Sequence, residues 1–170
     1  PTDDIDELLA PVSEDEPCGE DLYDLTDYHV LDSMVQGREE TQFAEAEEPD
    51  WPAVLEKSRD LLGQGKHLQV AVWLTHALAE RQGIAGLRDG LNLIHGLLVR
   101  YWDSLYPELD EDDDNPALER MNILLDIGSE TGGFIRSVKR VPIADSRRLG
   151  KFCWRDIQIA KGEIPPPEGG

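Results

Sequence analysis

The sequence predicts an all-α fold, a compact single-domain bundle of about six to eight helices joined by long acidic loops. Between residues 66 and 107, apolar side chains recur at intervals of three and four, the spacing of one face of a helix. Asp, Asn, Pro and Gly stand where such segments begin and end. The runs between them are rich in Asp and Glu, which favours solvated loops.

The length and composition fit one globular domain. A chain of 170 residues with 39% hydrophobic content has enough apolar surface to bury a core. We expect the domain to span residues 1–162. Residues 163–170 are rich in Pro and Gly, which is typical of a linker, so we expect further C-terminal domains in the full-length protein.

The charge is strongly negative and unevenly distributed. Asp and Glu outnumber Lys and Arg by 36 to 16, for a net charge of −20, which argues against nucleic-acid partners because phosphate backbones would be repelled. Residues 1–50 carry 18 acids and one base, whereas residues 134–161 carry eight bases and two acids. We therefore expect an acidic flank and a basic flank that face different partners or each other.

Compartment signals are few. The two cysteines are far apart in sequence and form no disulfide framework, which favours a reducing compartment. No apolar run reaches the ~18 residues of a membrane span, and the acidic N-terminal end lacks the basic region of a signal peptide. We expect no direct membrane insertion.

The N-terminal third is predicted to alternate helix and loop. A short helix is expected before Pro11, then a loop. Thr26 is the predicted N-cap of a second helix that Gly37 ends. Residues 38–50 have the composition of a solvated connector, from which Phe43 is expected to dock on the core.

The middle of the chain predicts the centre of the core. Asp50-Trp51-Pro52 predicts the start of a helix that runs to about Leu62. The next helix, over residues 66–81, is apolar nearly all round, which is typical of a buried helix. Gly83 separates it from a helix over residues 84–101, so the two are expected to form a helical hairpin.

Two glycines inside the second arm of that hairpin need a reason. Gly86 and Gly90 are four residues apart, and each costs about 1 kcal/mol relative to alanine inside a helix. We expect them to permit the close approach of a neighbouring helix.

Asn115 and Pro116 predict the start of a further helix that runs to about Ile127. Its apolar positions, which we expect to be buried, are Leu118, Met121, Leu124, Leu125 and Ile127. Residues 134–138 form a short amphipathic segment. Beyond it, two short extended segments are expected at residues 141–143 and 151–154, followed by a helical turn at residues 154–160.

No catalytic or metal-binding constellation emerges. Asp110, Asp112 and Asp114 have the spacing that opens a calcium loop, but the glycine and the final glutamate of that loop are missing. The four histidines lack zinc-ligand spacing. Cys18 lies among acidic residues, which disfavour its thiolate, so we interpret it as a small buried anchor. We expect no enzyme activity, no metal and no cofactor.

Two segments favour a role in recognition as well as in structure. The cluster of Tyr101, Trp102, Tyr106 and Pro107 closes a helix end, and Trp and Tyr are also common interface anchors. The loop at residues 17–22 is either a simple turn or a recognition loop, because it combines polar residues with a proline and a glycine. The candidate interaction or structural residues are Pro17, Cys18, Gly19, Glu20, Asp21, Leu22, Trp102, Asp103, Tyr106 and Pro107.

These segments, taken in order, resemble one family. The motifs that carry the resemblance are Pro17-Cys18-Gly19-Glu20-Asp21-Leu22, Asp50-Trp51, Lys66-His67-Leu68, Trp73-Leu74-Thr75, Gly83-Ile84-Ala85-Gly86-Leu87, Gly90-Leu91, Tyr101-Trp102-Asp103-Ser104-Leu105-Tyr106-Pro107, Arg120-Met121-Asn122, Pro142-Ile143, Leu149-Gly150 and Arg155-Asp156. Over about residues 8–162 the chain resembles the ImpA-related N-terminal domain of TssA, a component of the bacterial type VI secretion system. It departs from the family at His67, where an aspartate is usual, and we expect that change to cost a helix-capping carboxylate.

The resemblance implies an all-helical, non-enzymatic assembly component that acts in the cytoplasm. Family members contact the baseplate and prime or coordinate polymerisation of the tail tube and sheath. It also implies that the full-length protein forms a ring-shaped homo-oligomer through C-terminal domains that lie outside this sequence.

Two alternative functions remain open on the residues alone. One is an acidic hydrolase-like enzyme that uses paired carboxylates near Asp103 or in residues 110–114, which would require a cleft holding two carboxyls of raised pKa. The other is an acidic mimic of nucleic acid, which would require a regular array of carboxylates on a folded surface. The acids fall mostly in predicted loops, which argues against such an array.

Overall fold

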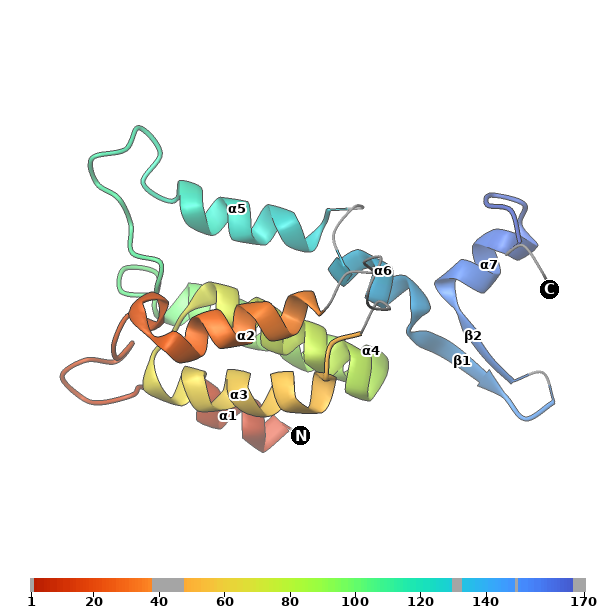
Figure 1. Cartoon of the computed structure of the whole chain (residues 1–170), viewed down its shortest axis with the longest axis horizontal. Helices are drawn as coiled ribbons and strands as arrows, with labels where there is room; N and C mark the ends of the chain where they lie inside the picture. The colour runs from red at the N-terminus through yellow and green to blue at the C-terminus, as the bar shows by residue number, and fades with distance from the viewer. Residues whose placement is uncertain (1, 38–47, 130–132, 149, 167–170) are drawn as a thin grey trace, which may run out of the picture.

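The structure is a computed structural model, and it describes residues 2–37, 48–129, 133–148 and 150–166. This part of the chain contains seven α-helices, one 3-10 turn and one two-stranded sheet (Figure 1). In chain order the elements are α1 (Thr2–Leu9), η1 (Leu22–Asp24), α2 (Thr26–Gln36), α3 (Trp51–Gln64), α4 (Leu68–Arg100), α5 (Leu118–Ile127), α6 (Gly133–Arg140), β1 (Pro142–Ser146), β2 (Gly150–Cys153) and α7 (Trp154–Ala160).

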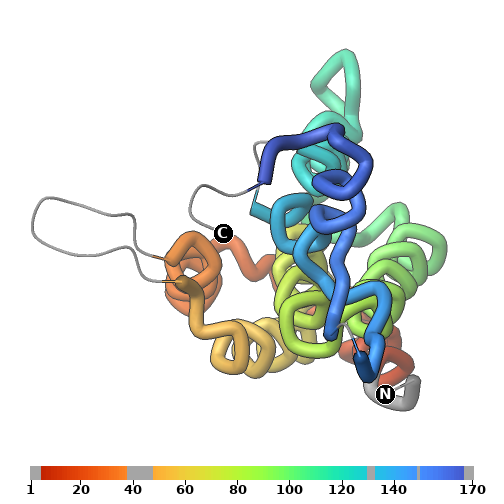
Figure 2. Tube along the Cα trace, turned by 90° about the vertical axis from the view of Figure 1, so that its right-hand side faces the viewer, coloured from red at the N-terminus to blue at the C-terminus, as the bar shows by residue number. Residues whose placement is uncertain are grey.

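The fold is mostly helical, but the all-α prediction is incomplete. The segments predicted to be extended are β1 and β2, which pair antiparallel with Ser146 opposite Gly150. This hairpin and α7 project from one end of the bundle (Figure 1), the end that faces the viewer in Figure 2. The side chains of the hairpin are exposed or half-buried, so the pairing rests on backbone hydrogen bonds rather than on an apolar face.

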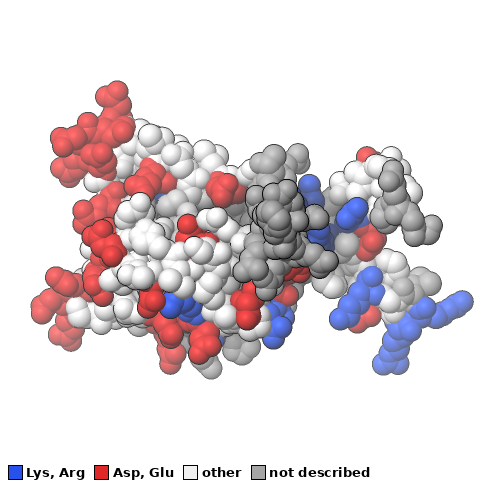
Figure 3. All heavy atoms as spheres, in the orientation of Figure 1, with Lys and Arg blue, Asp and Glu red and all other residues white. Residues whose placement is uncertain are grey.

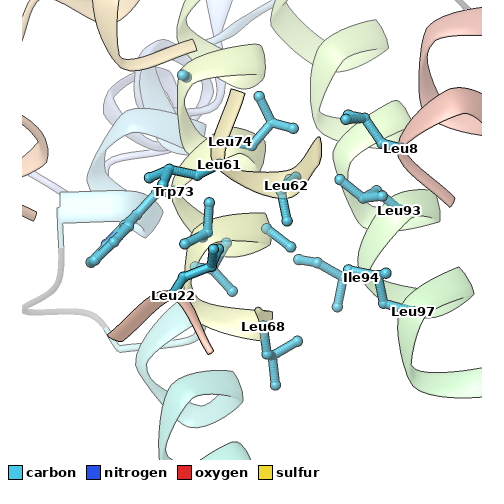
Figure 4. Packing of buried hydrophobic residues seen from close by; sticks show 14 of the residues in the cluster. Leu8, Leu22, Leu61, Leu62, Leu68, Trp73, Leu74, Leu93, Ile94 and Leu97 are labelled. Carbon is cyan, nitrogen blue, oxygen red and sulfur yellow. The ribbon is translucent and has the colours of Figure 1, made fainter. Parts of the chain in front are cut away.

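The core surrounds the first arm of α4. Within Leu68–Ala79 every residue except Gln69 is buried, as the all-round apolar pattern predicted. Leucines of α3 and of the second arm of α4 complete this core, and Figure 4 shows Leu62 and Leu97 among them. α1 joins through Ile5, Leu8 and Leu9.

Gly83 turns α4 back on itself. Its φ of 67° is open to glycine and strained for other residues, and the two flanking arms pack against each other. A Cβ on Gly90 would lie 2.7 Å from the Cα of Thr75, and a Cβ on Gly86 would lie 2.1 Å from the carbonyl oxygen of Leu78. Both glycines therefore sit where one arm touches the other, as predicted.

Helix ends follow local chemistry in most places. Asp50 caps α3, accepting a hydrogen bond from the Ala53 amide at 3.2 Å, and Gly37 ends α2 with a φ of 65°. Thr26 was predicted as the N-cap of α2, but the cap is Leu25, and its side chain makes no capping bond. Phe43 lies outside the described residues.

The prediction for the buried face of α5 was wrong at three of its five positions. Leu118, Met121 and Leu125 are exposed, whereas Leu124 and Ile127 are half-buried against the core, and the fully buried residues are Arg120 and Ile123. The helix also begins at Leu118 rather than at Asn115. Two stripes of α5 have helical spacing, and the structure buries the one that contains Arg120.

Candidate docking site

Three segments distant in sequence meet at one end of the bundle. They are residues 17–22, 64–68 and 101–107, and with Arg120 we call them the motif junction. The Lys66 amide donates to the Cys18 carbonyl at 2.7 Å, and the Tyr106 amide donates to the Lys66 carbonyl at 3.0 Å. The Leu68 amide then donates to the Tyr106 carbonyl at 2.7 Å. The motifs of the sequence are thus joined backbone to backbone.

Gly19 allows the first of these contacts. Its φ is +65°, and a Cβ there would lie 2.1 Å from the carbonyl oxygen of Gln64, so a side chain would force the segments apart. The Tyr106 hydroxyl donates to the Gly19 carbonyl at 3.3 Å. The conformation at Gly19 is therefore part of the junction itself.

Cys18 and Leu22 are anchors beneath the loop. Cys18 is 4% exposed, and its Sγ lies 3.2 Å from the Ser104 Oγ, which ties the loop to the segment after α4. Leu22 is fully buried in the core. The interpretation of Cys18 as a buried anchor is confirmed.

Arg120 stabilises the motif junction through buried hydrogen bonds to its backbone. Its side chain has no exposed surface, and Nε donates to the Pro107 carbonyl at 2.7 Å. Nη1 donates to the Trp102 carbonyl and Nη2 to the Leu105 carbonyl. Burial lowers the pKa of the guanidinium, but arginine stays charged at any physiological pH. One cation therefore satisfies three carbonyls of residues 102–107 that have turned away from helical pairing.

The structural role of Arg120 was not predicted from the sequence. A signal was present: positions 120, 123 and 127 form a helical stripe as regular as positions 118, 121 and 125. Hydrophobicity favoured the second stripe, because a buried arginine is rare unless paired. Here the carbonyls of a non-helical loop supply the pairing.

Lys66 and His67 are also buried and bonded internally. The Lys66 Nζ donates to the Leu62 carbonyl at 2.9 Å, and burial lowers its pKa. His67 Nδ1 accepts from the Gln69 amide at 3.2 Å, so the imidazole caps the N-terminus of α4. It takes the place of the capping carboxylate that an aspartate at this position would supply. Burial lowers the pKa of His67 to about 4, which leaves the ring neutral and able to accept at pH 7.

The predicted site residues divide by exposure. Cys18, Leu22 and Pro107 are buried, and Pro17, Gly19 and Tyr106 are half-buried. The exposed members are Glu20, Asp21, Trp102 and Asp103, which we call the exposed rim. Trp102 is 41% exposed, and its ring lies 5.0 Å from the Arg120 guanidinium carbon, in cation–π geometry.

The rim is acidic as well as aromatic. The end of the molecule that carries it is lined with Asp and Glu (Figure 3). Asp21 Oδ1 accepts from the Tyr23 amide at 2.9 Å, which holds its carboxylate in place. The buried polar groups of the junction are used in internal hydrogen bonds, so this arrangement supports a shaped surface rather than a reacting pair.

Within the described ranges, no three His, Cys, Asp or Glu side chains are grouped as metal ligands would be. Across those same residues, no helix combines the length and the hydropathy needed to cross a membrane.

Fold and site together define a helical domain whose motif residues build one rigid, acidic and aromatic end. The sequence profile described as "ImpA, N-terminal, type VI secretion system" matches residues 9–128. The chain belongs to this ImpA N-terminal family of the type VI secretion system.

Two relatives agree with this membership. The type VI secretion system component TssA1 of Pseudomonas aeruginosa is 39% identical over 164 residues, which are 94% of this chain and 47% of that protein. A solved structure of the N-terminal domain of TssA from Burkholderia cenocepacia, which includes the conserved ImpA_N region, superimposes with a TM-score of 0.74. It is 30% identical, and the match covers 93% of this chain and 58% of that one. The chain thus spans about half the length of the curated relative it matches.

Proposed function

We propose that this domain is a non-enzymatic docking module in the assembly of the bacterial type VI secretion tail. In this proposal it contacts baseplate, tail tube or sheath components through the exposed rim of the motif junction, in the cytoplasm. Membership of the ImpA N-terminal family supports the secretion-system role. One observation supports the docking site most strongly. The buried Arg120 donates hydrogen bonds to the backbone of residues 102–107, the segment that carries the exposed Trp102 and Asp103.

The rim has the properties of a pre-organised interface. An aromatic side chain such as Trp102 buries a large area on binding at a low cost in conformational entropy. The backbone that carries it is fixed by Arg120, so little further ordering is required on binding. The other members of the exposed rim, Glu20, Asp21 and Asp103, carry carboxylates that favour a basic surface on the partner, because opposite charges across an interface select the partner and its orientation.

We also propose a domain organisation. Residues 1–162 are taken as the ImpA N-terminal domain and residues 163–170 as a linker to C-terminal domains through which the full-length protein forms its ring. The incomplete coverage of TssA1 is consistent with this division. Cleavage of the full-length protein with a non-specific protease under native conditions tests it, since the linker is expected to be cut first.

Co-purification tests the docking proposal. The full-length protein is expected to retain baseplate, tube or sheath subunits, and the rim variant Trp102→Ala with Asp103→Asn is expected to lose at least about tenfold of the retained subunit. The matched control is Trp154→Ala with Asp145→Asn, which removes an equally exposed tryptophan and one exposed carboxylate at the other end of the molecule. Equal retention by both variants would exclude the rim as the contact, and no retention by the wild type would exclude the function.

A further inference from the structure

Eight of the 16 Lys and Arg residues of the chain fall within residues 134–161, and cationic side chains gather at the end opposite the motif junction (Figure 3). There α6 and α7 pack against each other, and a cavity of about 400 Å³ opens between them. It is lined by Arg136, Lys139, Arg140, Arg155, Gln158 and Ile164, and we call it the basic pocket. It is independent of the rim and of the function proposed for the rim.

The fold directs these side chains to one place. Arg136, Lys139 and Arg140 have i, i+3 and i+4 spacing on α6, so they share a face of that helix. The rotation of α6 is fixed on its other side, where His76 Nε2 lies 2.7 Å from Ser137 Oγ and its ring lies 5.2 Å from the Phe134 ring. Core packing therefore fixes the wall of the pocket that α6 forms.

Three guanidinium groups of the pocket form no ion pair with a carboxylate of the described residues. Among the described residues, none of Arg136, Arg140 and Arg155 has an acidic oxygen within the 4.0 Å of an ion pair. The nearest acid in sequence is Asp156, whose Oδ2 accepts from the Cys153 amide at 2.8 Å. That bond lowers the pKa of the Asp156 carboxyl, and the charge of Arg155 lowers it further, so Arg155 has one carboxylate nearby although the two form no ion pair. Like charges at this density repel one another, so an incoming carboxylate would relieve that repulsion.

We propose that the basic pocket docks an acidic segment of a partner protein. Carboxylates of the segment pair with Arg136, Arg140 and Arg155, since arginine forks match carboxylates bidentately. One apolar side chain of the segment packs over Ile164, the apolar member of the lining. The required partner sequence therefore has two or more acids next to a leucine or an aromatic residue.

Charge favours a short peptide over a nucleic acid or a membrane. The chain as a whole carries −20, and the acidic excess lies outside residues 134–161. A long polyanion or an anionic bilayer that reached the pocket would also face that acidic surface and be repelled by it. A short segment would contact the pocket alone, and charges beyond the ~8 Å screening length act on it only weakly. A pocket of this size also takes a side chain, not a duplex backbone.

Fluorescence anisotropy with a labelled Glu-Glu-Leu repeat dodecapeptide tests the proposal. The wild-type domain is expected to bind it, more weakly as salt is raised, and to bind the Gln-Gln-Leu version at least about tenfold more weakly. Arg136→Glu with Arg140→Glu is expected to lose at least about tenfold in affinity. The matched control is Arg147→Glu with Arg148→Glu. It changes the net charge by the same amount at the same end of the molecule, but outside the pocket lining, and it is expected to lose less than about threefold in affinity.

Each other result overturns the proposal. Equal losses in both variants would mean diffuse attraction without a pocket, and no binding by the wild type would mean no site. Tighter binding of a single-stranded RNA of the same charge, or of phosphatidylserine vesicles, would replace the partner class. Circular dichroism melts check that the variants fold, and the single variant Arg155→Gln, on α7, is expected to weaken binding even if a change in α6 disturbs the helix.

Discussion

Arg120 Nε donates to the carbonyl oxygen of Pro107 at 2.7 Å, in a place where the arginine has no exposed surface. This bond joins α5 to the loop that carries the exposed rim. Without the Arg120 side chain, the carbonyls of Trp102, Leu105 and Pro107 would each lose a buried donor. The relationship links stability to the proposed docking surface, because the same side chain maintains both.

Replacing Arg120 with methionine is expected to lower the free energy of unfolding by about 3 kcal/mol or more, because buried carbonyls are left without donors. Urea denaturation monitored by circular dichroism measures this. Arg100→Met, at the exposed end of α4, is the matched control and is expected to change stability by less than about 0.5 kcal/mol. A similar small change in both variants would show that Arg120 does not hold the loop.

Replacing Gly90 with alanine is expected to destabilise the domain by about 1–3 kcal/mol, since the new methyl group would meet Thr75 where the arms of α4 touch. Gly63→Ala is the control. Gly63 is also helical, but open space surrounds it, so alanine there is expected to stabilise by up to about 1 kcal/mol. Thermal melts of the two variants should therefore shift in opposite directions, and a shared stabilisation would contradict the close packing.

Acid is expected to unfold the domain through two histidines. Burial lowers the pKa of both His67 and His76 to about 4, from 6.5 in the unfolded chain. Glu80 approaches His76 at 4.0 Å, but burial outweighs it. Between these pKa values the unfolded state binds protons that the folded state does not, so their contribution is complete above pH ~6.5 and is lost as the pH falls towards ~4.

The expected loss is about 2 kcal/mol per histidine at pH ~5. Urea melts across this range measure it. His76→Gln is expected to flatten the pH dependence, whereas His95→Gln, at an exposed position of α4, is expected to leave it unchanged. An unaltered slope in His76→Gln would mean that the pKa of this histidine is the same in the folded and unfolded states.

The sequence predicted best where local chemistry decides the structure. The all-round apolar pattern before Gly83, the breaks at Gly37 and Gly83, and the cap at Asp50 all follow from side-chain spacing and backbone freedom, and the structure confirms them. The short segments after residue 140 were also predicted as extended, although their pairing into a hairpin was not.

The candidate site was only partly predictable. The sequence predicted both the loop at residues 17–22 and the aromatic segment at residues 101–107 as candidate recognition segments. Their contact was not predicted, because it depends on long-range backbone hydrogen bonds that the periodicity of the sequence does not encode. The buried face of α5 was wrong for a related reason. A leucine stripe and an arginine stripe fit the same helix, and the choice depends on carbonyls of a distant loop that need a cationic donor.

Photo-crosslinking in secreting cells tests the docking proposal most directly. A photoreactive amino acid placed at Asp103 of the full-length protein is expected to crosslink to a baseplate, tube or sheath subunit. The same group at Val99, which is 68% exposed on α4, is expected to yield at least about fivefold less. Equal yields at both positions, or crosslinks at Val99 alone, would contradict a docking role for the exposed rim.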